Sequence, residues 1–485
     1  MIGTRAIVVL LLIWPCVMPG AAAAGADGPV LTLAEAVNEA LTHNDRLINE
    51  QDSVEQAALG VTLARNDFRP KVVPNVQGSF GQTNISNQTY RLDLSQRLAT
   101  GTELRAAFGT SSAQIPSFGA PGLDDVRFYN ADTTLTLSQP LLRGFGPGVA
   151  RRALVSATSR QMDAGVQRKL VEQAVVVETA RAYYAIVAQQ ALVTVAAASL
   201  ARSRRHRDAA EAKLDAGLVS QLDVFRAHQL VSQAEVQLFD AEAAVEDARD
   251  QLRFLIGRDS DELFEVADRI PRTVDGTGAA EAAAIALDNR LDLQRSVAAA
   301  EEAERAIAFT RNQLLPQFDV NLSLARRETA QSLGSSFGVD RFRFATFFAV
   351  SLPLDRTPAL IDHNNALIER DRRRREIDTL RKRVVDEVRR AVRQRDRFVR
   401  NVAAADANVD IARQEVEVAA LRYERGLSNN LDVVAAEANL LNTQSRQIAA
   451  LADATVARLA LRATMGILDA RKDLAEPAVA AQGEP

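Results

Sequence analysis

Apolar residues recur along this chain with two different periods, and both periods appear in each half of the sequence. From Phe318 to Leu324 every second residue is apolar, with polar residues between. The same alternation occurs at 342–352 and, in the first half, at 72–80, 90–96, 102–108 and 129–139. Alternation gives a β-strand one apolar and one polar face. These segments are therefore predicted strands, and the first half carries an extra candidate hairpin with its turn at Gly101.

A second period, of three to four residues, predicts very long helices. It is clearest at Ile377, Leu380, Val384, Val388 and Val392. Helical patterns run over about 149–215 and 358–424, each followed by a glycine turn and a returning helix to about 254 and 464. At 1.5 Å per residue, roughly 65 residues span about 100 Å. Helices of this length do not fit a compact domain, so the pattern predicts antiparallel helical hairpins packed as coiled coils.

Shorter helices precede the strands in each half. Thr32 and Glu35 form a predicted capping box for a helix that runs to about Phe68 and is stopped by Pro70. The corresponding helix of the second half runs over about 279–314 and is stopped by Pro316. Each half thus reads as helix, strands, helix, turn, helix.

The order of elements reflects a tandem duplication. Residues 212–257 and 421–466 align without a gap, and "ALTHNDRL" at 40–47 pairs with "ALDNRLDL" at 286–293. "LSQPLL" at 137–142 likewise pairs with "VSLPLD" at 350–355. Landmarks that recur in one order over more than two hundred residues indicate two copies of a large unit. In chain order, we expect a signal peptide at 1–24, a first repeat at 29–258, a linker at 259–278, a second repeat at 279–468 and a C-terminal tail at 469–485.

The N-terminus has the features of an export signal. A positive region at 1–5 precedes the apolar run "AIVVLLLIWP", and "AAAAG" supplies small residues for cleavage near Ala24. Cys16, the chain's single cysteine, lies inside the removed part. Lipidation at Cys16 is the alternative, but Trp14 and Pro15 replace the small residues that a lipobox requires. After Ala24 no apolar run of membrane-spanning length is expected.

Composition and motifs give no support for an enzyme or a nucleic-acid-binding protein. The four histidines (His43, His206, His228 and His363) lie far apart in the pattern, and no catalytic, cofactor-binding or metal-binding set can be assembled. "RGFGPG" at 143–148 lacks the Lys-Ser/Thr of a phosphate loop. The arginine-rich stretch at 370–400 is interleaved with acids and keeps helical spacing, which favours the charged face of a coiled coil. The net charge of −4 fits this interpretation.

Two nearly identical turns are the most specific signal. "AGLVSQLDVF" at 216–225 and "RGLSNNLDVV" at 425–434 each join two predicted long helices. Gly217 and Gly426 are predicted helix C-caps, because glycine adopts positive φ at little cost. Asp223 and Asp432 lie in the first turn of the next helix, where a carboxylate favours the helix dipole. Helix geometry explains each turn, but not why both share one length and one Gly-Leu pair.

Duplication, element order and the paired Gly-Leu turns resemble the TolC family of outer-membrane channel proteins over residues 31–468. The resemblance implies a mixed membrane α/β fold: a trimeric outer-membrane β-barrel continuous with a long periplasmic α-helical barrel of coiled-coil hairpins. Each protomer of the homotrimer is expected to lend four strands to a twelve-stranded barrel in outer-membrane lipid. Each would lend its helices to the periplasmic tube. The implied partners are a periplasmic adaptor protein and an inner-membrane pump of the RND or ABC type, with no cofactor and no nucleic acid.

The family's functional residues carry over only in part. The resemblance implies a periplasmic gate in which Tyr423 bonds to Asp223, and a ring of carboxylates from Asp432. The tip positions Gly217, Leu218, Gly426 and Leu427 are the expected adaptor contacts. Ser428 and Ala435 stand where the family's prototype has an arginine and a second aspartate, so this gate is expected to be held more weakly or by other bonds.

The expected function is a passive exit duct for tripartite efflux or type I secretion. One alternative is a periplasmic coiled-coil scaffold or adaptor, which the predicted strands disfavour. The other is a stand-alone porin, which the two long hairpins disfavour. The extra hairpin at 90–108 is open: it could extend an extracellular loop or lengthen strands beyond the membrane.

Overall fold

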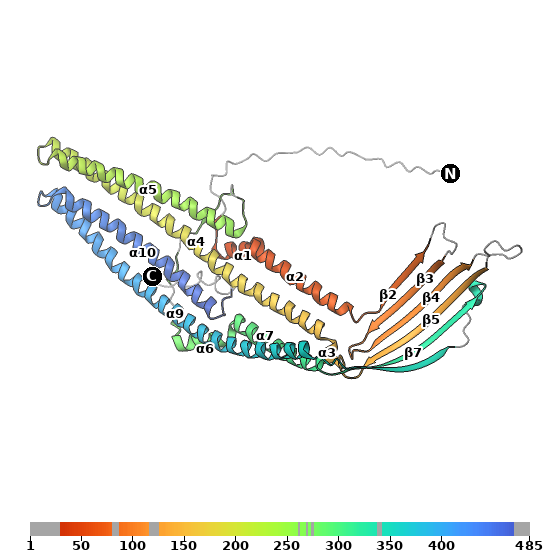
Figure 1. The fold of residues 1–485 in the computed structure, drawn as a ribbon. Helices are drawn as coiled ribbons and strands as arrows, with labels where there is room; N and C mark the ends of the chain where they lie inside the picture. The colour runs from red at the N-terminus through yellow and green to blue at the C-terminus, as the bar shows by residue number, and fades with distance from the viewer. Residues whose placement is uncertain are drawn as a thin grey trace, which may run out of the picture.

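The computed structural model describes residues 30–79, 87–115, 126–259, 262–267, 270–272, 276–336 and 342–469. The expected signal peptide and almost all of the expected C-terminal tail lie outside these residues. The described chain is elongated, with a β-sheet at one end and two helical hairpins that reach the opposite end (Figure 1). A small parallel pair of strands joins β1 (Val30–Leu31) to β6 (Glu265–Val266), and it was not predicted from the sequence.

The helix expected to run from Thr32 to Phe68 is two helices. Its capping box is present, with the Glu35 carboxylate accepting from the Thr32 amide at 2.9 Å. However, α1 (Leu33–His43) ends at Asn44, whose extended backbone starts α2 (Asp45–Asn66). The Asn44 side chain caps α2 and donates to the Leu255 carbonyl at 2.9 Å. The single-helix prediction was wrong because this asparagine serves as a cap and as a tertiary contact.

The second repeat breaks at the equivalent place. There α6 (Ala279–Asn289) and α7 (Leu291–Gln313) meet at Arg290, again with extended backbone. Glycines at the ends of the returning helices fit closely against both breaks. A Cβ on Gly257 would lie 2.8 Å from the His43 Cβ, and one on Gly466 would lie 3.0 Å from the Asn289 backbone. Both glycines have positive φ, so conformation and packing each require glycine.

The long helices match the prediction closely. They are α4 (Arg152–Asp215), preceded by the short α3 (Pro147–Ala150), and α9 (Thr357–Glu424), with 64 and 68 residues in the two long ones. They return as α5 (Gln221–Ile256) and α10 (Asn430–Thr464). The predicted register of α9 is confirmed, because Val384 and Val388 are fully buried against α6 and α10.

The main core lies midway along the helices, where α1, α4, α5 and α10 meet. Tyr183 donates its hydroxyl to the Leu31 carbonyl at 3.2 Å, and burial raises the pKa of Tyr184 to about 12. Within the described residues, α4 contains a window long and apolar enough to cross a membrane by length and composition alone, 39% of it buried. The sequence led us to expect no such run. Because the middle of α4 supplies Val175 and Ile186 to this core, packing accounts for its apolar character.

All six segments with alternating residues form one antiparallel sheet. Its strands lie in the order β2 (Lys71–Gly78), β3 (Asn87–Arg97), β4 (Glu103–Ile115), β5 (Val126–Pro140), β7 (Gln317–Ala330) and β8 (Arg343–Ser351). A one-turn helix, α8 (Leu333–Ser336), follows β7. The resemblance implied that each protomer lends four strands to a barrel, and the described sheet of one protomer has six strands.

The β3–β4 turn lies at the helical end of the sheet. Gly101 has φ of 94°, and the Thr100 carbonyl accepts from the Gly146 amide at 3.0 Å, close to the start of the long helix. A Cβ on Gly101 would lie 2.6 Å from the Gly144 carbonyl oxygen, so only glycine fits. The version in which 90–108 extends an extracellular loop is therefore wrong. The hairpin belongs to the sheet.

The pairing register sorts the sheet into two faces. Side chains in paired positions of neighbouring strands share a face, because pleating alternates along each strand. One face is apolar across all six strands, through the pairs Val76–Tyr90, Leu92–Phe108, Leu135–Leu324 and Val320–Phe348 and through Leu104–Leu137. The other face is mostly polar, and there the Asn75 amide and the Arg91 guanidinium both donate to Asp93. One apolar and one polar face is the pattern of a membrane β-barrel wall.

Candidate functional site at the helical tips

The two tips have the same backbone turn, closed by equivalent hydrogen bonds. Leu218 donates its amide to the Lys213 carbonyl at 2.8 Å, and Leu427 donates to the Arg422 carbonyl at the same distance. The glycine before each leucine, Gly217 or Gly426, has φ of 71° with no heavy atom within 4 Å of a Cβ placed there. Backbone conformation alone therefore requires these glycines.

Caps restart the helices after each turn. Ser220 caps α5, and its hydroxyl donates to the Asp223 carboxylate at 2.7 Å in a capping box. Asn429 caps α10 by accepting from the Asp432 amide at 3.2 Å. Asp432 is exposed and stands in α10 where Asp223 stands in α5. The two turns are thus equivalent in backbone and differ in their side-chain bonds.

Each tip presents large apolar side chains to solvent. Leu218 and Leu427 are 73% and 74% exposed, and Leu222 and Leu431 are more than half exposed. Phe225 adds a fifth apolar side chain on α5. The equivalent leucines repeat across the two tips, so the chain offers the same apolar group twice.

The hydrogen bond expected between Tyr423 and Asp223 is not formed. The Asp223 carboxylate is engaged by Ser220 and lies 3.8 Å from Arg226. Tyr423 is buried, and its hydroxyl has no hydrogen-bond partner among the described residues. Burial, and then the nearby negative charge of Asp223, raise the pKa of Tyr423. Within this protomer Asp223 instead serves its own helix as a capping residue.

Lys213 supplies one of the bonds that join the two hairpins at this level. Its ammonium, on α4, donates to the Tyr423 carbonyl and, at 3.4 Å, to the Glu424 carbonyl on α9. It also lies 4.0 Å from the centre of the Tyr423 ring. A cation at the carboxyl end of α9 favours the helix dipole as well as the two carbonyls.

Asn430 supplies a second connection, between three helices. Its amide nitrogen donates to the backbone carbonyl of Asp223 on α5, and its Oδ1 contacts Nε2 of His206 on α4. Because Oδ1 can only accept, this arrangement places a proton on Nε2 of His206. The His206 ring packs 4.9 Å from that of Tyr423, and Asn430 has no exposed surface. We call Lys213, Tyr423, His206 and Asn430, with the Asp223 carbonyl, the tip network.

Sequence reasoning missed most of the tip network. It identified Tyr423 and Asp223 but not Lys213, His206 or Asn430. One signal was available: Asn430 stands where the first repeat has Gln221, and an asparagine at a buried helix start requires partners.

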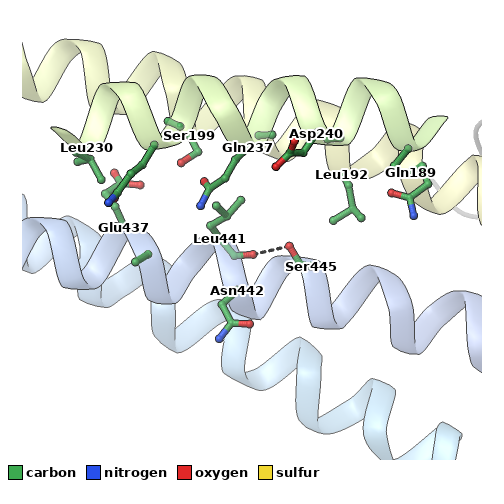
Figure 2. Close-up of a pocket in the computed structure, with 16 residues that line it drawn as sticks. Gln189, Leu192, Ser199, Leu230, Gln237, Asp240, Glu437, Leu441, Asn442 and Ser445 are labelled. Atoms are coloured by element: carbon green, nitrogen blue, oxygen red, sulfur yellow. Dashed lines mark hydrogen bonds between the residues drawn. The ribbon is translucent and has the colours of Figure 1, made fainter. Parts of the chain in front are cut away.

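Farther from the tips than the tip network, an ion pair joins α10 to α4 next to a cavity. Arg202 donates from Nε to both carboxylate oxygens of Glu437, at 3.0 and 2.8 Å, and Glu437 is buried. The cavity has a volume of about 440 Å³ and lies between the α4/α5 hairpin and α10. Figure 2 shows polar side chains at its walls, among them Gln189, Gln237 and Asn442. Among the residues that the structure describes, no group of three or more histidine, cysteine or acidic side chains could hold a metal ion.

A membrane-type sheet continuous with long paired helical hairpins, repeated twice along one chain, defines an outer-membrane channel protomer. The chain belongs to the outer membrane efflux protein family, whose model matches residues 36–258 and 283–467. These segments cover most of both repeats. Membership places the protein in the outer membrane, with its helices extending into the periplasm.

Solved structures share this fold at low sequence identity. The outer-membrane channel OprN aligns with a TM-score of 0.68 and 17% identity, over 90% of this chain and 89% of that one. VceC of Vibrio cholerae gives 0.68 and 18%, over 90% and 96%. The open-state MtrE channel of Neisseria gonorrhoeae gives 0.63 and 17%, over 90% and 89%.

A curated relative shows higher identity over a shorter stretch. The fusaric acid resistance protein FusA of Burkholderia cepacia is 33% identical over 142 residues. That match spans 29% of this chain and 26% of FusA.

Proposed function

We propose that the protein is the outer-membrane exit duct of a tripartite efflux pump or a type I secretion system. In this proposal the chain forms a homotrimer and acts as a passive channel without catalytic residues. The observation that carries it is the continuity of the sheet, apolar on one face, with helices of 64 and 68 residues that end in two equivalent tips. Such a molecule connects a membrane to a point about 100 Å away.

The exposed leucines of the tips support a docking role for this end. Leu218 and Leu427 stand on turns where each is more than two-thirds exposed. Apolar groups gathered on exposed tips are typical of an interaction site. We assign the tips to a periplasmic adaptor protein, through which an inner-membrane pump of the RND or ABC type would supply cargo and energy.

The tip network is the proposed closure of the duct. Lys213 and Asn430 connect the α4/α5 hairpin to the α9/α10 hairpin, so breaking these bonds would let the two tips separate. Threefold repetition would also bring Asp432 side chains together as a ring of three carboxylates, which favours cations at the mouth.

Assembly and export test the proposal. The protein should be recovered from the outer-membrane fraction as a trimer that dissociates on heating. A soluble periplasmic species would instead support the scaffold alternative and overturn the proposal. Export by cells lacking the chromosomal copy should depend on the plasmid-borne chain together with an adaptor. Export that needs no adaptor would indicate a stand-alone porin.

Tip variants separate docking from assembly. Leu218→Glu with Leu427→Glu should abolish export while the heat-dissociable trimer remains. Gln221→Glu adds one negative charge, half of that added by the double variant, at a polar, exposed tip position and should leave export nearly unchanged. Equal loss in both would mean that added charge, rather than lost apolar surface, is responsible.

A further inference from the structure

The sheet contains one hairpin more than the tandem repeat requires. β7 follows α7 and Pro316, and β8 leads into α9; in the first repeat β2 follows α2 and Pro70, and β5 leads into the long helix α4. The surplus elements are β3 and β4, which lie between β2 and β5 in the chain and in the sheet.

The β3–β4 hairpin is part of the wall. β3 pairs with β2 from Lys71–Ser95 to Gly78–Gln88, and β4 pairs with β5 over its whole length. Leu92 and Phe108 of the hairpin continue the apolar face of the sheet. A hairpin that plugged the lumen or stood above the membrane would have no reason to keep this apolar face in register with its neighbours.

The polar face also continues through the hairpin. Asn75 on β2 donates to Asp93 on β3 at 3.0 Å. On β4, Gly109 leaves room for the Asp132 carboxylate of β5, since a Cβ there would lie 2.5 Å from its Oδ1. On the polar face, close contacts thus join β2 to β3 and β4 to β5.

Within the described sheet, two edges remain unpaired, on β2 and β8. In the antiparallel order β2-β3-β4-β5-β7-β8 these two edge strands run in opposite directions, so β8 of one copy can pair antiparallel with β2 of another. Unpaired backbone amides and carbonyls are not tolerated in the hydrocarbon layer, so both edges must be covered there. A second copy of the chain is the partner that matches both.

We propose that β8 of each protomer pairs with β2 of the next and that three protomers, with six strands each, close an eighteen-stranded barrel. The inference rests on the trimer of the proposed function. With strands about 4.8 Å apart and tilted about 40°, eighteen strands enclose a barrel about 36 Å across, against about 24 Å for twelve. The membrane part of the duct is then about 1.5-fold wider than the family resemblance implied, with a polar wall suited to bulky hydrated cargo.

A competing closure uses β4 as the edge strand. β4 runs in the same direction as β2, so β4, β5, β7 and β8 alone would close a twelve-stranded barrel if β2 and β3 left the wall. Val72 and Val76 on β2, with Leu92 on β3, would then lose their place on the apolar face. The continuous apolar face favours the eighteen-stranded closure.

Cysteine pairs distinguish the two closures. Ala349 on β8 and the three β2 positions Val73, Asn75 and Gln77 belong to the polar face, as does Ala107 on β4. Ala349→Cys combined in turn with cysteine at each β2 position should give disulfide-linked oligomers on non-reducing gels, most strongly for the pair in register. Ala349→Cys with Ala107→Cys should give none, and each single variant is a control.

The outcomes separate this inference from the proposed function. A crosslink from Ala349 to Ala107 in an intact trimer would overturn the eighteen-stranded closure while leaving the exit duct in place. No crosslink from Ala349 to any of the β2 positions in an intact trimer would overturn it as well. Failure to find a trimer would overturn the proposed function itself. Should the cysteine variants assemble poorly, electron cryo-microscopy of the unaltered trimer counts the strands directly, and twelve would contradict the inference.

Discussion

Replacing Lys213 with methionine is expected to loosen the closed tip. Methionine keeps an unbranched side chain but removes the charge that contacts two carbonyls of α9 and the ring of Tyr423. A hydrogen bond from a charged donor contributes roughly 1.5–3 kcal/mol, and a cation–π contact at a partly exposed site about 0.5–1 kcal/mol. Because 1.36 kcal/mol is tenfold in an equilibrium, the open tip should gain at least about tenfold in population per protomer.

Single-channel recording in planar bilayers measures this shift. Lys213→Met should raise the conductance or the open probability while the heat-dissociable trimer is retained. Tyr423→Phe is the matched control, because it removes only a hydroxyl that has no hydrogen-bond partner among the described residues. It should change conductance little, whereas the Tyr423–Asp223 bond implied by the family resemblance would predict a large rise in conductance. Unchanged conductance in Lys213→Met, or equal opening in Tyr423→Phe, would refute the tip network as the closure.

Three further predictions concern packing, the ion pair and selectivity. Val388→Asp should prevent assembly or lower the melting temperature sharply, because an unpaired charge at a fully buried position costs several kcal/mol by order of magnitude. Arg374→Ala loses only an exposed ion pair and should lower the free energy of unfolding by less than about 1 kcal/mol. Glu437→Ala leaves Arg202 without its buried partner and should destabilise the protein by up to about 3 kcal/mol in thermal unfolding, whereas Glu437→Gln should cost less. Asp432→Ala should shift ion selectivity away from cations, measured as a reversal potential in a salt gradient, without raising conductance; an unchanged reversal potential would remove Asp432 from the mouth.

Long-range periodicity made most of the fold predictable. The six alternating segments became strands because a sheet with one face toward lipid must alternate along every strand. The three-to-four spacing of α9 predicted that Val384 and Val388 lie in the core, because a helix packed along one face keeps its apolar residues on that face. The alternation marked all six strands of the sheet, but it left open whether the hairpin at 90–108 belongs with the other four.

The missed features depend on contacts between distant parts of the chain. The helix break at Asn44 arises where a residue caps one helix and bonds to Leu255, more than two hundred positions away. In the tip network, Lys213 and Tyr423 come from different repeats. Local patterns do not report such pairs. The capping role of Asp223 was readable, however, because Ser220 stands three positions before it.

The length of α9 makes the distant tip sensitive to its packing in the middle of the molecule. Tyr423 lies 35 residues beyond Val388, which corresponds to about 50 Å of helix. A rigid rod of that length that rotates by 5° about its buried point carries its end about 4 Å sideways. A change of side-chain volume at Val388 can shift the core by only a fraction of an ångström. At the tip, the resulting displacement can therefore exceed the donor–acceptor distances of the Lys213 hydrogen bonds. Variants that alter the opening of the tip are therefore expected far from the tip, among the buried residues that pack around Val388 on α9.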